Sequence, residues 1–108
     1  MTNYKTLING HLDIMVIKNE DEFEGVKEYW DEVLIHGNPE GLRSLAALLL
    51  KLADANQESN SSLPVGAREH VHLHPQFELS KSSVPVIVGR LDAKSTGAFY
   101  DSYMPKES

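Results

Sequence analysis

A helix signal that begins at Asn38 constrains the fold of this chain more than any other feature. An Asn side chain caps a helix well because it accepts hydrogen bonds from the free amides of the first turn. Pro39 suits the first helical position, where its missing N–H costs nothing. The sequence therefore predicts a long helix over residues 39–56. Its apolar stripe follows the i, i+3, i+4, i+7 spacing and contains Leu42, Leu45, Ala46, Leu49, Leu52 and Ala53, widened by Leu48 and Leu50.

Strand-like segments lie on both sides of this helix. They alternate between apolar and polar residues or are rich in β-branched residues, which is typical of strands. The acidic stretch 19–24 indicates a turn or loop, with irregular chain before residue 29, and 58–66 indicates a polar linker. We expect strands over 12–18, 29–36, 69–74 and 84–91.

These elements predict a two-layer α+β fold. One long helix would pack on a mainly antiparallel sheet of about four strands. We expect a single domain over residues 1–92. Leu45 and Leu49 are assigned to its core, on the condition that both side chains are fully buried. The tail, 93–108, would be flexible or would dock on a partner subunit, and covering the open face of the sheet could produce a homodimer.

Composition excludes several classes of function. The chain has 108 residues and a net charge of −6, which disfavours nucleic-acid binding through phosphate contacts and suits a basic partner. It has no cysteine, so disulfides and Cys-ligated metals are ruled out. Residues 1–10 lack the apolar segment of a signal peptide, and no apolar run is long enough to span a membrane. We expect a cytoplasmic protein that does not bind membranes.

Three histidines form the most conspicuous polar pattern. His70, His72 and His74 alternate along one predicted strand, so their imidazoles would project from the same face. Such a face could share a metal, with His11, His36 or a carboxylate as a further ligand. The simpler interpretation is the polar half of an amphipathic strand, and we expect no bound metal or other cofactor. A small metal-binding protein or metal-dependent enzyme is the alternative, and His72 could also contact a partner.

Acidic and aromatic residues make a second candidate site. Carboxylates cluster between Glu20 and Glu32, among them Glu22 and Glu24. They could be the solvated residues of a loop or a negative patch that recognises a basic protein. Tyr29 and Trp30 follow, and an exposed pair of this kind would be a binding hot spot, whereas a buried Trp30 would belong to the core.

Catalytic signatures are missing. The sequence contains no Gly-x-Ser-x-Gly nucleophile elbow, no P-loop and no Gly-x-Gly-x-x-Gly motif. Residues 37–41 lead into the helix N-terminus, where helix capping explains them better than anion binding. We therefore expect no catalytic residues and a protein that is not an enzyme.

Three motifs together resemble a known family. They are the helix entry Ile35-His36-Gly37-Asn38 with the leucines after it, the segment His70-Val71-His72-Leu73, and the strand Ser82-x-Val84-Pro85-Val86-Ile87-Val88. The chain resembles immunity protein family thirty-two of bacterial polymorphic toxin systems over residues 30–91. The resemblance implies a non-enzymatic module that binds a cognate protein toxin and neutralises it.

Overall fold

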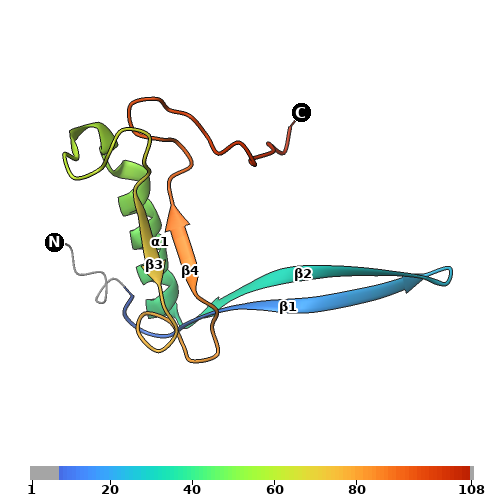
Figure 1. Cartoon of the computed structure of the whole chain (residues 1–108). Coiled ribbons are helices and arrows are strands. Elements are labelled where there is room, and N and C mark those ends of the chain that lie inside the picture. Colours follow the sequence, from blue (N-terminus) through green and yellow to red (C-terminus); the bar gives the residue numbers. More distant parts are fainter. Residues whose placement is uncertain (1–7, 108) are drawn as a thin grey trace.

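Two hairpins and one α-helix are the main elements of the part of the chain that is described. The computed structural model describes residues 8–107, so residues 1–7 of the expected domain and Ser108 of the expected tail lie outside it. One hairpin packs against the helix, and the longer one projects away from both (Figure 1). The elements are β1 (Leu12–Phe23), β2 (Val26–Gly37), α1 (Pro39–Asp54), a short 3-10 helix η2 (Gln57–Ser59), β3 (His70–Leu73) and β4 (Val86–Gly89).

The helix begins where the sequence predicts. Asn38 Oδ1 accepts hydrogen bonds from the amides of Gly41, at 2.8 Å, and His11, at 3.0 Å. The same side chain therefore caps α1 and holds it to the residue before β1. The helix ends at Asp54, two residues before the predicted end, and Ala55 donates back to the carbonyl of Leu52. No helix in residues 8–107 is both long and apolar enough to cross a membrane.

The core lies between α1, the β3–β4 hairpin and the start of β1. Leu48 and Leu52 face this core, whereas Leu45 is only partly buried and Leu49 is 46% exposed. The expectation of a core position is therefore wrong for Leu49, whereas Leu45 packs against the core without being fully buried. A sheet of two strands is too narrow to cover the whole leucine stripe. The buried core cluster comprises Ile8, Leu12, Ile14, Leu48, Leu52, Val71, Leu73 and Leu79.

The strands are antiparallel, as predicted, and the fold is α+β. In residues 8–107 they form two sheets of two strands each, in the orders β1-β2 and β3-β4, rather than one sheet of four. The start of β1 is nevertheless tied to the loop before β4. The amide of Val84 donates to the carbonyl of Ile14 at 2.9 Å, and the amide of Ser80 donates to that of Leu12 at 3.0 Å.

The acidic stretch is strand, not loop. The register of β1 and β2 runs without interruption from Leu12↔Gly37 to Phe23↔Val26. Glu24 and Gly25 close it with positive φ angles of 52° and 81°, as in the two-residue turns that match the twist of a hairpin. The predictions of a loop at 19–24 and of irregular chain before residue 29 are therefore wrong.

Candidate protein-binding arm

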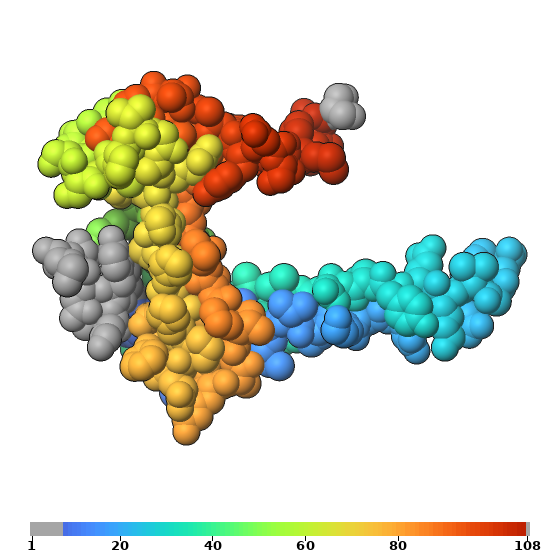
Figure 2. Space-filling view, in the orientation of Figure 1, coloured from blue at the N-terminus to red at the C-terminus, as the bar shows by residue number. Residues whose placement is uncertain are grey.

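The far part of the long hairpin, residues 18–32, is here called the arm. It stands clear of the rest of the molecule (Figure 2), and every residue from Glu20 to Glu32 is exposed. The arm carries seven carboxylates and two lysines, a net charge of −5 out of −6 for the whole chain. Low burial leaves these charges solvated, and an exposed surface of one sign steers an oppositely charged partner.

The two aromatic residues of the arm lie on opposite faces. Side chains alternate along a strand, so Tyr29 shares a face with its cross-strand partner Glu20, and Trp30 shares the other with Asn19. Trp30 is 42% exposed, which rules out the core interpretation. Its indole Nε1 donates to Glu32 Oε1 at 2.9 Å, and this bond holds the ring along its face.

The apolar pair at the tip of the arm was not predicted from the sequence. Phe23 and Val26 form an exposed cross-strand pair there, next to Glu22 and Glu24. Reading residues 19–24 as a loop concealed this pair. The available signal was Glu24-Gly25 between two apolar residues, because Gly readily adopts the positive φ that a two-residue hairpin turn requires.

The histidines lie elsewhere: His70 and His72 are on the solvent-exposed face of β3, and His74 follows directly after this strand. The ring centroids of His70 and His72 are 5.2 Å apart, and those of His72 and His74 are 6.0 Å apart and stacked. Their alternation on one face is as expected, and His72 is not part of the arm. Among residues 8–107, no group of three or more His, Asp or Glu side chains is arranged to hold a metal ion.

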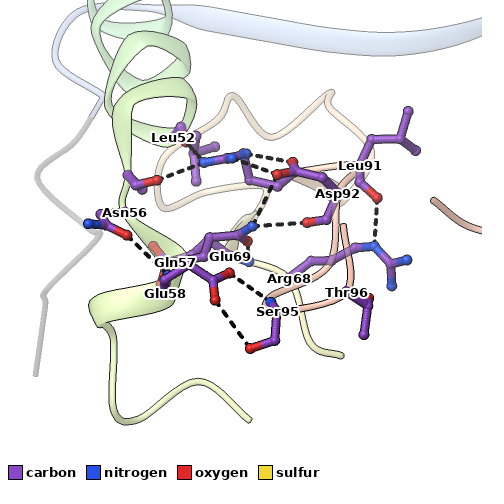
Figure 3. A network of polar contacts seen from close by, with 12 residues as sticks. Leu52, Asn56, Gln57, Glu58, Arg68, Glu69, Leu91, Asp92, Ser95 and Thr96 are labelled. Carbon is purple, nitrogen blue, oxygen red and sulfur yellow. Dashed lines mark hydrogen bonds and ion pairs between the residues drawn. The ribbon is translucent and has the colours of Figure 1, made fainter. Parts of the chain in front are cut away.

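A partly buried polar network joins the end of α1 to the chain after β4 (Figure 3). Arg90 binds both carboxylate oxygens of Asp92 at 2.8 Å and donates to the carbonyls of Leu52 and Ala55. Gln57 donates to the carbonyl of Asp92 and accepts from the amide of Glu69. The hydrogen bonds from Arg90 lower the pKa of Asp92. These polar groups bond to other groups of the protein, so the network acts as a structural clamp between the end of α1 and the chain after β4.

A comparison of the sequence with protein-family models identifies the family of this chain. The model of immunity protein 32 matches residues 32–91, which is more than half of the chain. The chain belongs to the immunity protein 32 family. No curated protein and no solved structure shows significant similarity to it.

Membership of the immunity protein 32 family agrees with the resemblance seen in the sequence. The family is generally non-enzymatic, and toxins are the general partners of immunity proteins. The matched residues include α1, β3 and β4. The match begins at residue 32, so all of the arm but its last residue precedes it.

Proposed function

We propose that this chain neutralises a cognate protein toxin by binding it through the arm, without chemistry of its own. The observation that carries the proposal is the concentration of charge and aromatic surface on one exposed hairpin. Carboxylates would raise the association rate with a basic toxin, and desolvated aromatic anchors would supply most of the affinity. We also propose that the complex forms in the cytoplasm and needs no cofactor.

The shape of the arm favours a cleft on the partner. Tyr29 and Trp30 project from opposite faces, and carboxylates lie on both: Glu20 and Glu22 on the face of Tyr29, Asp21 and Glu28 on the face of Trp30. A flat partner surface would contact only one face. We propose that the arm enters a cleft with basic walls, which contact both faces at once. Contact of His72 with the toxin stays a separate prediction, because β3 lies outside the arm.

The position of the arm also fits a role in specificity. It lies almost wholly outside the residues that match the family model. A surface that distinguishes one toxin from another is expected to differ between family members. The matched part, residues 32–91, would then supply the body on which the arm is mounted.

Binding kinetics with the toxin encoded next to the gene of this protein test the proposal. Glu22→Gln combined with Glu24→Gln should slow association, and this loss should shrink at high salt because salt screens exposed charges. Trp30→Ala should leave association unchanged and speed dissociation by about tenfold or more, as expected for a hot-spot residue.

A matched variant controls for net charge. Asp101→Asn combined with Glu107→Gln also removes two exposed carboxylates, but from the C-terminal segment, and should leave both rates unchanged. The proposal fails if the adjacent toxin does not bind. It also fails if the arm variants and the control variant have the same kinetics.

A further inference from the structure

The outer edge of β2 carries a row of backbone groups that point away from β1. Both the N–H and the C=O of Ile14 bond to the loop before β4, so this residue directs its backbone away from β2. Opposite residues of an antiparallel pair behave alike, and the two kinds of pair alternate along the strands. Because Ile14 pairs with Ile35, every second residue of β2 directs its backbone outward. On the exposed part of β2 these residues are Lys27, Tyr29, Asp31, Val33 and Ile35.

This edge lacks the structural features that usually protect an exposed strand. Edge strands are commonly short, bulged, interrupted by proline or covered by another segment. β2 has 12 residues and no proline, and it keeps its register with β1 without a bulge. In residues 8–107, no segment other than β1 forms backbone hydrogen bonds with β2 between Lys27 and Ile35. Charged side chains are therefore the protection that remains.

The outer edge of β1 is already partly used. The loop before β4 bonds to Leu12 and Ile14 at the base of the hairpin. Near the tip, the amide of Glu22 donates to the side chain of its neighbour Asp21 at 2.8 Å. Only the shorter stretch 16–20 of this edge stays free in the described chain. A strand of the usual length, about five or six residues, therefore fits better on β2.

The charge of the arm decides which kind of strand suits this edge. The arm carries a net charge of −5, so the arm of a second copy would bring like charges side by side, which destabilises strand pairing. Glu28 and Glu32 lie on the same face of β2 as Trp30. A strand with Lys or Arg at alternate positions would place its positive charges beside these two carboxylates. The edge thus disfavours a second arm and suits an extended basic segment.

We propose that an extended basic segment of the toxin pairs with the outer edge of β2 as a third strand. The inference rests on the proposed toxin binding and specifies its geometry. In strand addition, main-chain hydrogen bonds supply affinity and alternate side chains supply specificity. The edge of β2 would enter the proposed cleft first, so that the added strand forms the floor of the cleft while its walls contact the two faces. A third strand would also stabilise a hairpin that is marginal with two.

Proline substitutions at the two edges of the arm test the pairing. Asp31→Pro removes the carboxylate and an outward N–H, whereas Asp31→Asn removes only the charge. The hairpin should tolerate the proline, because the lost N–H is not bonded to β1 and Trp30 already has the extended backbone that a following proline requires. Asp31→Pro should bind the adjacent toxin about tenfold or more weakly than Asp31→Asn. The difference should persist at high salt, because it does not depend on charge.

The same pair of changes on β1 provides the matched control. Glu20 is exposed and has an outward N–H, as Asp31 does, but it lies on the edge that the proposal leaves unpaired. Glu20→Pro and Glu20→Gln should therefore bind the toxin with the same affinity as each other, both reduced only by the lost charge. Equal affinities of Asp31→Pro and Asp31→Asn would overturn the proposal, as would an equally large effect of proline at Glu20.

Circular dichroism shows whether the proline variants stay folded. If Asp31→Pro unfolds the hairpin, Val33→Pro compared with Val33→Ala tests the same edge with the same expected difference. A dimer of the free chain that Asp31→Pro dissociates would assign the edge to a second copy and overturn the proposal. If the unaltered chain does not bind the toxin, the proposed function fails and this inference with it. If it binds and the proline variants match their controls, only the added strand fails.

Discussion

Gly41 lies where the first turn of α1 crosses the backbone of His11. A Cβ atom at this position would lie 2.0 Å from the carbonyl oxygen of His11, and backbone cannot move aside as a flexible side chain can. The glycine thus permits the close approach in which Asn38 also bonds to His11. One residue without a side chain sets how near the helix can come to the start of β1.

Gly41→Ala should reverse the usual effect of this substitution in a helix. Alanine normally stabilises a helix relative to glycine by about 1 kcal/mol. Here the clash should instead destabilise the fold by about 1–3 kcal/mol, the usual cost of overpacking. Chemical denaturation measures the difference. Ala53→Gly, on the exposed side of the same helix, provides the ordinary cost for comparison, and a stabilising Gly41→Ala would contradict the close approach.

Asp13 joins β1 to the serine-rich turn before β4. Its Oδ1 accepts hydrogen bonds from the hydroxyls of Ser80 and, at 2.6 Å, Ser82. These bonds lower the pKa of Asp13 below its ordinary value of 3.8. Because the folded-state pKa is the lower one, ionised Asp13 stabilises the fold above that ordinary value. The stabilisation is lost as the pH falls through the folded-state pKa.

Asp13→Asn should therefore change how the stability of the fold depends on pH. At about pH 6 the variant should be less stable than the unaltered chain, since a charged acceptor forms stronger hydrogen bonds than an amide. Below about pH 4, where Asp and Glu titrate, the variant should lose less stability with falling pH. Urea denaturation over this range measures both effects. Parallel pH curves for the two proteins would show that the carboxylate makes no such contribution.

At the scale of elements, local signals were enough for the helix and the short strands. Asn38 and Pro39 mark the start of α1 whatever packs on it, and alternation of His with Val71 and Leu73 marks β3 because one face is buried. The arm offers no such contrast, because both of its faces are exposed and charged residues occupy both. Periodicity detects a strand by its buried face, so the paired strands at Asp21 and Glu28 escaped detection.

The position of the core on α1 depends on the width of the sheet beneath it. The leucine stripe alone favoured Leu45 and Leu49, but the two-stranded β3–β4 sheet covers Leu48 and Leu52. Which leucines are buried is a property of the partner surface and is not encoded in the helix. The candidate site has the same origin: Trp30 and Glu22 were recognisable as candidates, but their placement on one projecting hairpin required the register of β1 with β2.

Leu48 and Leu50, which differ in burial on α1, test this placement of the core. Leu48 is 2% exposed and Leu50 is 64% exposed. Leu48→Ala should cost about 2–5 kcal/mol of unfolding free energy, because it removes buried methyl groups and leaves a cavity. Leu50→Ala should cost about 0.5 kcal/mol or less, as for a surface substitution. Equal losses in a denaturation series would mean that the helix faces the core differently.

The whole molecule divides into a body and an arm. Its longest dimension is 56 Å and its shortest 19 Å, and its radius of gyration of 17.1 Å exceeds the roughly 13 Å of a compact chain of this length. The body contains the core and the residues that match the family model. The arm has little burial of its own and carries most of the charge. In the proposed function, the arm binds the toxin while the body holds the fold.

Hydrogen exchange of the free chain and of its complex with the adjacent toxin tests the central claim, that the arm is the toxin-binding surface. Segments with few buried contacts open at little cost, so amides in residues 18–32 should exchange quickly in the free chain. They should be strongly protected in the complex, while α1 and the β3–β4 hairpin change little. Protection confined to α1, β3 and β4, with the arm still exchanging quickly, would contradict the claim.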